Sequence, residues 1–392
     1  MDFQLKVFPA SGNAGPAGKV RIVATINGIE HPPEVLWTFL STEQPAMAPV
    51  LQLASRDSVS NHHAHLDIHL PVPGFQQVTC RVNGDERKVR VYREPEKLQK
   101  PLTSQPDFAA YWMATLISLS RIPMGIHIRD VSTAKGIRLS EVTISSVDRV
   151  AVRGWLEEPV KPGRYPSVLR VPGYGGSMEP LGMFTDRVVF SFNPRGHGNS
   201  QDTVKGKPED FWIRGLDNKA GYYYQGCFMD CVRAVDFLAQ HRSVDVSRMA
   251  VWGGSQGGGL AFATAALSSN VALCLADIPF MCDWDGYFKL SDWPEMESWI
   301  CDASHRSWQT TLKTLSYFDT MNLAGRIRCP VRMGIGLQDD VCPPSTSFAA
   351  FNRIRGPREY TIYPTHGHGG QNNQAPSRQA CPNSQDTQGG EG

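Results

Sequence analysis

The chain has 392 residues, of which 41% are hydrophobic and 20% are charged, and its formal net charge is +1. This length exceeds the size at which a single hydrophobic core usually stops growing, so two domains are expected. The near-neutral charge gives no electrostatic reason to expect nucleic acid or a membrane as a partner, and no apolar run approaches the roughly 18 residues of a membrane span.

The chain begins with MDFQLKVFPASG, which has neither the basic start nor the apolar stretch of a signal peptide, so we expect a cytoplasmic protein. Its nine cysteines lie mostly in apolar stretches such as VALCLAD around Cys274. An odd number of cysteines in such surroundings is typical of buried, reduced thiols and does not suggest a disulfide framework.

Residues 1–93 are predicted to form a small all-β sandwich of immunoglobulin-like type. Short β-branched or alternating runs are separated by turn residues, and Asn83-Gly84 between two such runs is a strong hairpin signal. Several short strands at this spacing are typical of a sandwich. The expected strands are FQLKVFP, KVRIVATINGI, EVLWTFLST, HAHLDIHLPV, QQVTCRV and RKVRVYR.

Residues 94–105 are predicted to be a linker, because they contain several prolines and lysines. From Asp107 the apolar residues recur at helical spacing in DFAAYWMATLISL. Residues 106–370 then alternate apolar strands with helices such as YYQGCFMDCVRAVDFLAQ, a pattern that predicts a doubly wound α/β domain. The polar residues 371–392 cannot bury a core, so we expect them to be disordered.

Gly253-Gly254-Ser255-Gln256-Gly257 fits the pattern G-x-S-x-G. A predicted strand ending in RMAVWGG precedes it, and the helix-forming run LAFATAAL follows. This is the context of a nucleophile elbow, in which a sharp strand-to-helix turn lifts a serine hydroxyl above the sheet. Ser255 is therefore the candidate nucleophile.

A serine nucleophile needs a base, and the base needs an acid to orient it. In α/β-hydrolases these follow in the order Ser, Asp, His, each at the carboxyl end of a strand. LQDDVCPP after one predicted strand offers Asp339 and Asp340, and THGHGG after the next offers His366 and His368. The order and the placement both match.

The oxyanion of an acyl-transfer intermediate needs two backbone N–H donors. The residue after the nucleophile, Gln256, is one candidate. The glycine-rich loop PGYGG after an earlier predicted strand offers Tyr174 or Gly175 as the second.

Two other features could bind a ligand, although each has a plainer interpretation. NHHAHLDIHL places three imidazoles and a carboxylate on one face of a strand, which could hold zinc but is more typical of a solvated strand face. These residues are His63, His65, Asp67 and His69. Trp293 and Trp299 could stack on sugar rings, but tryptophans are more often part of the core.

The stretch from residue 106 to 370 resembles the acetyl xylan esterase and cephalosporin C deacetylase family, carbohydrate esterase family seven. The motifs that carry the resemblance are PGYGG, PRGHG, YYYQGCFMDCVRAVDF, GGSQGGG, ADIPF, TLSYFD and GLQDDVCPPSTSFAAFN. The resemblance implies an α/β-hydrolase fold, here preceded by the extra sandwich.

The resemblance also implies residue roles. Ser255 matches the family nucleophile, Asp339 the acid and His368 the base. Tyr174 and Gln256 match the residues whose N–H groups form the oxyanion hole. No metal or organic cofactor is implied.

Phe280, Pro294 and Val341 match positions that line a small acyl pocket in the family. Arg195-Gly196-His197 matches a signature usually seen as Arg-Gly-Gln, for which we expect a structural role. The chain departs from the family in the front sandwich and in Gly369, where members usually have glutamate. It also lacks the usual closing helix and has a shorter segment after PRGHG, a region that contributes to oligomer contacts in the family.

These observations predict a serine carboxylesterase that removes acetyl groups from a carbohydrate, such as acetylated xylo-oligosaccharides, or from cephalosporin C. A homo-oligomer is a further expectation. Two alternatives stay open: an acyl-CoA thioesterase or acyltransferase, and a carbohydrate-binding scaffold on an inactive hydrolase frame. A serine in place of cysteine at position 255 and the GLQD…CPP signature argue against the first.

Overall fold

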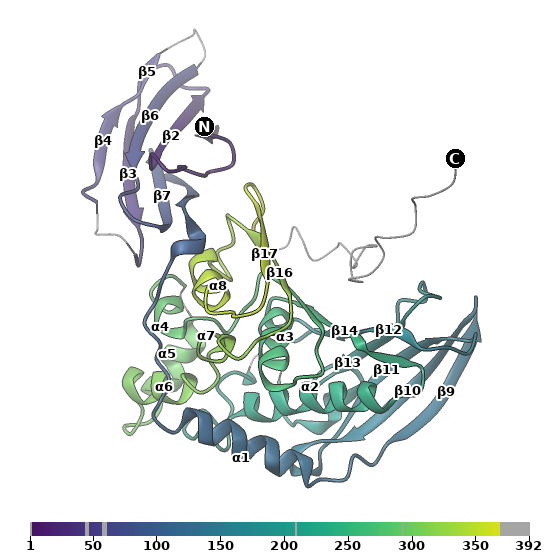
Figure 1. The fold of residues 1–392 in the computed structure, drawn as a ribbon. Helices are drawn as coiled ribbons and strands as arrows, with labels where there is room; N and C mark the ends of the chain where they lie inside the picture. Colours follow the sequence, from purple (N-terminus) through teal and green to yellow (C-terminus); the bar gives the residue numbers. More distant parts are fainter. Residues whose placement is uncertain (1, 44–46, 57–60, 208–209, 292, 369–392) are drawn as a thin grey trace, which may run out of the picture.

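The computed structural model describes residues 2–43, 47–56, 61–207, 210–291 and 293–368 (Figure 1). The tail expected from residue 371 onward and Gly369 lie outside these ranges. Two small antiparallel sheets form the N-terminal part, and a nine-stranded sheet with helices forms the rest.

The two N-terminal sheets share one hydrophobic cluster, to which both contribute buried residues such as Ile22 and Trp37. The first sheet has the strand order β1-β2-β6-β5 and the second β4-β3-β7-β8. The predicted hairpin is confirmed: Val82 pairs with Asp85, and Asn83 and Gly84 between them have φ angles of 48° and 91°. The bounds are β1 Asp2–Phe8, β2 Lys19–Asn27, β3 Glu34–Leu40, β4 Val50–Leu53, β5 Ser55–Arg56, β6 Asn61–His69, β7 Gly74–Val82 and β8 Asp85–Arg93.

The large sheet has the order β17-β16-β15-β14-β12-β13-β11-β10-β9. Strands β12 to β17 pair in parallel, as their continuous apolar runs predicted, whereas β9, β10 and β11 are antiparallel. The bounds are β9 His127–Ala134, β10 Ile137–Ser145, β11 Ala151–Pro159, β12 Tyr165–Val171, β13 Val188–Asn193, β14 Val244–Gly254, β15 Leu273–Asp277, β16 Val331–Gly336 and β17 Arg358–Tyr363.

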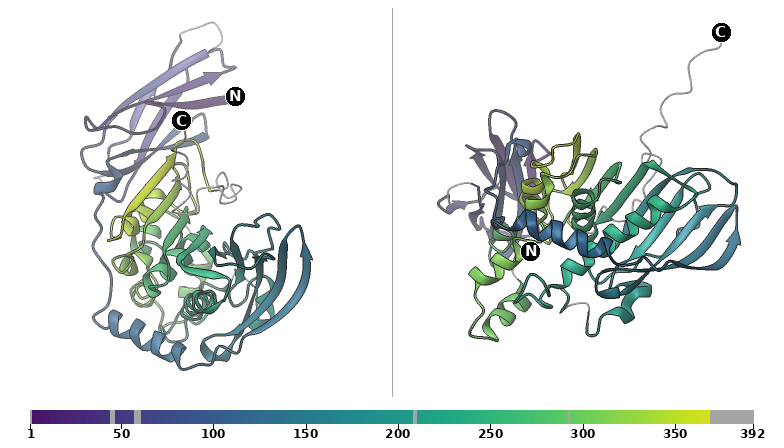
Figure 2. Two further views of the ribbon diagram at one scale, coloured as in Figure 1. Left: turned by 45° about the vertical axis from the view of Figure 1, so that its right-hand side comes forward. Right: turned by 60° about the horizontal axis from the view of Figure 1, so that its bottom comes forward.

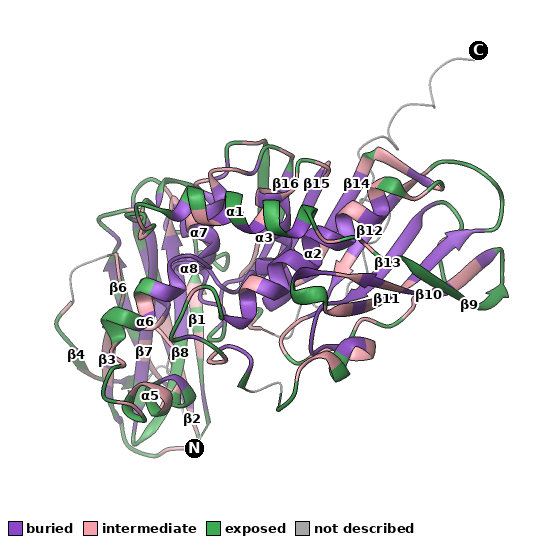
Figure 3. Ribbon diagram, turned by 90° about the horizontal axis from the view of Figure 1, so that it is seen from below, coloured by how far each residue is buried: buried purple, intermediate pink, exposed green. Residues whose placement is uncertain are grey.

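Helices α2 and α3 pack against the large sheet, and Figure 3 shows both as almost wholly buried. Helix α1 covers the outer side of α2, where the ring of Trp112 stacks on Phe228 with centroids 5.7 Å apart. This second layer explains why α2 is buried nearly all round. The bounds are α1 Phe108–Ser120, α2 Tyr223–Gln240 and α3 Gln256–Leu267.

Short helices connect the later strands. They were not predicted individually, because each is too short to show a periodic pattern. None of the described helices is long and apolar enough to cross a membrane. The bounds are α4 Trp284–Tyr287, α5 Pro294–Cys301, α6 Trp308–Leu315, α7 Thr320–Ala324 and α8 Pro344–Phe351, with 3-10 turns η1 Pro95–Lys97, η2 Val147–Arg149 and η3 Gly198–Thr203.

The N-terminal sheets lie beside α8, β16 and β17, as the views of Figures 1 and 2 show. Phe75 of β7 contacts Phe348 of α8 with ring centroids 5.4 Å apart, and both belong to the main core cluster. The segment predicted as a linker is anchored here, because the Asn352 amide donates hydrogen bonds to the carbonyls of Pro95 and Leu98. The main hydrophobic core therefore extends to Phe75 and Tyr92 of the N-terminal sheets, whose interior forms a cluster of its own.

Candidate active site

Ser255 lies in the sharp turn between β14, which ends at Gly254, and α3, which begins at Gln256. Its φ and ψ angles are 57° and −121°, a region that side-chain-bearing residues seldom occupy. The Ser255 N–H donates to the Asp277 carbonyl at 2.9 Å, and the Ser255 carbonyl accepts from the N–H of Phe280 at 3.0 Å. The predicted strand–turn–helix context is present.

The glycines around Ser255 are needed because backbone segments approach closely. A Cβ at Gly253 would lie 2.4 Å from the carbonyl of Gly257, and one at Gly257 would lie 2.5 Å from the Val171 oxygen. A Cβ at Gly259 would lie 2.3 Å from the Phe280 oxygen. Such distances are far below van der Waals contact, so only glycine allows α3 to start this close to β12 and β15.

Asp339 and His368 meet at the carboxyl ends of β16 and β17. Nδ1 of His368 lies 3.0 Å and 3.1 Å from the two carboxylate oxygens of Asp339, whose side chain is fully buried. Oδ1 of Asp339 also accepts hydrogen bonds from the N–H groups of Val341 and Cys342 at 2.9 and 2.8 Å. Because the carboxylate oxygens are acceptors, Nδ1 carries the proton, and Nε2 is the ring nitrogen with the acceptor lone pair.

The structure separates the two histidines and the two aspartates that the sequence offered. His366 is exposed and its ring packs edge-on against Tyr363, with centroids 5.5 Å apart. The Asp340 side chain is 69% exposed and forms an ion pair with Arg90. Only Asp339 and His368 among these four therefore form the buried carboxylate–imidazole pair.

Cys342 brings the acid loop, the segment from Leu337 to Pro343, next to Ser255. Its Sγ lies 4.0 Å from the Ser255 Oγ, and its N–H is one of the two donors to Asp339. Burial raises the pKa of the Cys342 thiol well above its ordinary value, so the thiol is neutral. Ser255, Asp339 and His368 thus converge around one uncharged sulfur.

Potential metal ligands gather in one place within the described ranges. The ligand atoms of Asp339, Cys342 and His368 lie within 4.8 Å of one another. A neutral thiol is a poor ligand, and the carboxylate is already engaged by three donors, so the chemistry of this set fits a proton-transfer pair better than a metal. On β6, Asp67 is held by Arg21 at 2.7 Å and forms no such group with the neighbouring histidines.

Gln256 is the first residue of α3, so its N–H has no acceptor within the helix. Its side chain is buried and fixed at both ends. The Tyr224 hydroxyl donates to Oε1 at 2.7 Å, which turns Nε2 toward Nε2 of His197, 3.0 Å away. The loop with Tyr174 closes in a turn in which the Gly176 N–H donates to the Gly173 carbonyl at 3.0 Å.

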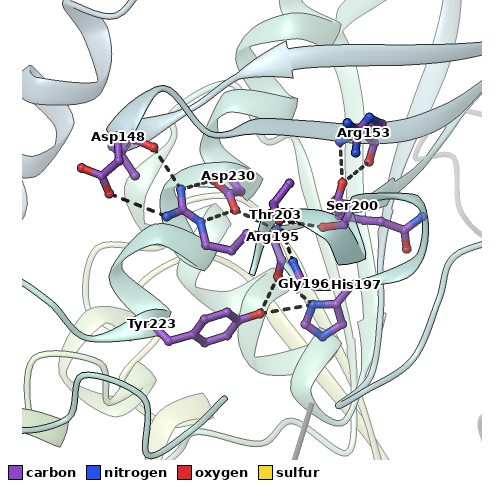
Figure 4. Close-up of polar contacts among 11 residues, drawn as sticks. Asp148, Arg153, Arg195, Gly196, His197, Ser200, Thr203, Tyr223 and Asp230 are labelled. Carbon is purple, nitrogen blue, oxygen red and sulfur yellow. Dashed lines mark hydrogen bonds and ion pairs between the residues drawn. The ribbon is translucent and has the colours of Figure 1, made fainter. Parts of the chain in front are cut away.

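Because the Gln256 amide donates to Nε2 of His197, that ring must be neutral with its proton on Nδ1. Nδ1 lies 3.1 Å from the carbonyl oxygen of Arg195, which also accepts from the Tyr223 hydroxyl at 2.6 Å (Figure 4). Burial lowers the pKa of His197, which outweighs the opposite effects of the Arg195 carbonyl and Asp230.

Arg195 anchors this network through a buried ion pair. Its guanidinium makes two hydrogen bonds of 2.8 Å with Asp230 of α2 (Figure 4). Burial alone would lower the pKa of Arg195, but the Asp230 carboxylate more than offsets this, so its pKa is raised. A structural role was expected for the Arg195-Gly196-His197 signature. In the structure the Arg195 carbonyl orients the His197 ring, and the His197 ring in turn holds the side chain of Gln256.

The predicted acyl-pocket residues differ in burial. Phe280 is 5% exposed and donates its N–H to Ser255, so it lies directly behind the turn. Val341 is 43% exposed on the acid loop, and Pro294 is exposed at the start of α5. The Trp293 ring packs against Trp212 at 4.0 Å, and Arg306 covers the Trp299 ring at 4.0 Å. Both tryptophans thus have protein partners, as the plainer interpretation predicted.

Sequence analysis missed three residues that contact this site. Cys342 appeared only as part of a motif, and Tyr224 only as part of a helix. Arg90 lies on β8, some 250 residues before the acid loop, and it is one of four basic residues in that strand, DERKVRVYR, so no local signal marks it.

A serine in a strand–helix turn, beside a buried carboxylate–imidazole pair at the edge of a mostly parallel sheet, defines a serine hydrolase of the α/β-hydrolase fold. Comparison with known proteins narrows the class. The chain belongs to the acetyl xylan esterase family, whose model matches residues 91–381. It is therefore a carboxylic ester hydrolase that acts on acetylated carbohydrates.

Individual relatives agree with this assignment. The chain is 29% identical over 375 residues to the acetyl esterase Axe7A of Xylanibacter ruminicola, a match that spans 90% of this chain and 83% of the relative. An acetyl xylan esterase from Paenibacillus sp. R4 is 32% identical with a TM-score of 0.66, covering 71% of this chain and 94% of that one. Acetyl xylan esterase 1 from Thermoanaerobacterium sp. is 27% identical with a TM-score of 0.64, covering 70% and 92%.

The close backbone approach at Gly257 predicts that Gly257→Ala distorts the turn and lowers esterase activity by about 10²-fold, since displacements of about 1 Å have that effect on catalytic groups. Hydrolysis of 4-nitrophenyl acetate by the purified variant measures this. Gly325→Ala is the control, because a Cβ there would lie 3.9 Å from the nearest atom. Full activity in Gly257→Ala would contradict the argument.

The lowered pKa of His197 predicts a defined pH dependence of stability. The unfolded chain takes up this proton near pH 6.5 or so, and the folded protein only at lower pH, so the stabilisation is present above about 6.5 and is lost as pH falls through the lowered pKa. His197→Gln should therefore lose less free energy of unfolding than wild type on acidification. Denaturant titrations at about pH 7.5 and about pH 5 measure the difference.

His31→Gln, a change at an exposed histidine, is the matched control and should follow wild type. An identical loss of stability on acidification in wild type and His197→Gln would show that His197 is not buried in its neutral form.

Proposed function

We propose that the protein hydrolyses acetyl esters of carbohydrates, such as acetylated xylo-oligosaccharides, by a Ser255–His368–Asp339 triad through an acyl-enzyme. The hydrogen bond between the buried Asp339 carboxylate and Nδ1 of His368 is the observation that supports it most directly. This bond selects one aspartate and one histidine from the two pairs in the sequence. It also sets the tautomer in which Nε2 of His368 has the acceptor lone pair that a base needs.

In the first half-reaction, the Ser255 Oγ attacks the acetyl carbonyl while its proton moves to Nε2 of His368. Asp339 holds Nδ1–H and stabilises the imidazolium that forms, without itself taking the proton. The imidazolium then donates this proton to the oxygen of the sugar, which leaves as an alcohol. The acetyl group remains on Ser255 as an ester.

In the second half-reaction, a water molecule gives its proton to Nε2 of His368 and attacks the acetyl-enzyme. Collapse of the intermediate returns the proton to the Ser255 oxygen and releases acetic acid, which loses its remaining proton to solvent and becomes acetate. In both halves, the N–H groups of Gln256 and Tyr174 donate to the negatively charged oxygen. Donors of this kind are typically worth about 10²–10³-fold in kcat each.

The neutral His197 and the Tyr224 hydroxyl support this role of Gln256 from behind. They hold its side chain in one orientation, so the first turn of α3 does not need to reorganise during the reaction. Phe280, Pro294 and Val341 are proposed to limit the acyl group to acetyl. The alcohol side is less restricted in this proposal, so cephalosporin C is a second candidate substrate.

Ser255→Ala and His368→Ala should each lose about 10⁴–10⁶-fold in kcat, because triad members act as a unit. His366→Ala is the matched control and should lose at most about tenfold, since its ring contacts Tyr363 and not Asp339. The assay is hydrolysis of acetylated xylo-oligosaccharides, with acyl-CoA as the competing substrate class. A larger loss in His366→Ala than in His368→Ala would overturn the assignment of the base.

A tight acyl pocket predicts that kcat/KM falls as the acyl chain grows from acetyl to butyryl to octanoyl. Each surplus methylene must displace packed side chains, and overpacking of this kind typically costs about 1–3 kcal/mol. A series of 4-nitrophenyl esters of increasing length measures this. Equal kcat/KM values for acetate and octanoate would refute the proposed pocket.

A further inference from the structure

Arg90 of β8, in the N-terminal sheets, reaches into the acid loop. The residue is 7% exposed, and its Nη1 donates to the backbone carbonyl of Asp339 at 2.7 Å. Its Nη2 donates to Oδ1 of Asp340 at 2.5 Å and to Oε1 of Gln77 at 2.6 Å. One buried guanidinium thus joins two strands of the N-terminal sheets to the residue proposed as the catalytic acid and to its neighbour.

The backbone of Arg90 makes a second set of contacts through Gln338. The Arg90 N–H donates to Oε1 of Gln338 at 2.7 Å, and Nε2 of Gln338 donates back to the Arg90 carbonyl at 3.3 Å. The same Nε2 donates to the Pro364 carbonyl at 2.8 Å. Gln338 therefore ties β8 both to the acid loop and to the segment that leads from β17 to His368.

The N-terminal part also packs against Leu337, the residue of the acid loop before Gln338. Gly12 has φ of +72°, and Leu337 Cδ2 lies only 2.7 Å from where a Cβ at that position would be. The N-terminal part therefore contacts four consecutive residues of the acid loop, Leu337 to Asp340. On its other side the Asp340 carbonyl accepts from the Ser291 hydroxyl at 3.1 Å.

The acid loop needs such external support. It contains no helix or strand between the end of β16 and the start of α8, yet it must present a fully buried carboxylate to one ring nitrogen. Within the loop, the N–H groups of Val341 and Cys342 orient the Asp339 side chain. The start of the loop is held beside β17, because the N–H groups of Leu337 and Gln338 donate to the carbonyls of Tyr363 and His366. At Asp339 and Asp340 the loop is held from the N-terminal sheets by Arg90.

We propose that Arg90 is a positioning residue of the esterase, through which the N-terminal sheets hold the Asp339 carboxylate in line with Nδ1 of His368. The inference rests on the proposed triad. Charge-assisted hydrogen bonds from a buried guanidinium are shorter and stronger than neutral ones, and the planar fork fixes direction as well as distance. Loss of the fork leaves the Asp339 carbonyl without this donor and allows the loop to shift.

The test compares Arg90→Met, which keeps an unbranched apolar stem but removes every donor, with Arg87→Met on the same strand. Arg87 is exposed and interacts with the Glu86 carbonyl and the Phe3 ring, both in the N-terminal sheets, so its variant serves as the control. Arg90→Met should lose about 10²-fold in kcat, the loss expected for a displacement of about 1 Å, with KM nearly unchanged. Arg87→Met should match wild type in both.

A spectroscopic measurement separates positioning from general destabilisation. The proton between Nδ1 of His368 and the Asp339 carboxylate gives a strongly deshielded NMR resonance when that hydrogen bond is short and ordered. This resonance should be present in wild type and Arg87→Met and weakened or lost in folded Arg90→Met. Wild-type kcat and an unchanged resonance in Arg90→Met, even with a lower melting temperature, would overturn the proposal.

Two milder variants cover the case in which Arg90→Met does not fold. Arg90→Lys keeps the charge and one donor and should recover part of the lost kcat. Asp340→Ala removes an exposed partner of the fork and should lower kcat severalfold at constant KM. Wild-type kcat in both would overturn the proposal. Failure of the proposed triad has a different signature, because Ser255→Ala would then remain active whatever the Arg90 variants do.

Discussion

The hydrogen bond between the Asp339 carboxylate and Nδ1 of His368 is the contact on which the site depends. Burying a carboxylate is costly unless hydrogen-bond donors compensate it, so the imidazole and two backbone N–H groups are needed to stabilise Asp339 in the folded protein. The two residues can meet only because β16 and β17 are parallel neighbours, in register from Val331–Arg358 to Gly336–Tyr363. Their loops therefore leave the sheet at the same edge.

Close backbone packing and a buried hydrogen-bond network maintain the strained backbone conformation of Ser255. Glycines at its flanks let β12, β14 and β15 approach the start of α3, and a buried polar chain of Tyr224, Gln256 and His197 fills the space behind. This polar chain continues from His197 to the Arg195 carbonyl and so to the Arg195–Asp230 ion pair (Figure 4), and hydrogen-bonded networks of this kind are rigid. An unfavourable backbone conformation persists only in such an over-determined setting.

The N-terminal sheets pack directly against the hydrolase part. Phe75 and Tyr92 belong to the main core cluster together with Phe348 of α8, so no solvent layer separates the sheets from the hydrolase part. The family match begins at residue 91, within β8, which is the strand that carries Arg90. The strand at this boundary is thus also the one that contacts the acid loop.

The sequence by itself determined the class of the fold and the candidate triad, since these depend on local signals: period-two and period-3.6 patterns, the Asn83-Gly84 turn, and a glycine cluster around Ser255. The residues alone left His366 and His368, and Asp339 and Asp340, as alternatives, and the family resemblance favoured His368 and Asp339. The tertiary structure shows why each pair differs: Asp339 is buried against His368, whereas Asp340 and His366 are exposed and contact other residues. The contacts of Arg90, Cys342 and Tyr224 appear only in the tertiary structure. Their partners lie far along the chain, and a hydrogen bond between distant segments exists only once packing has brought its two atoms together.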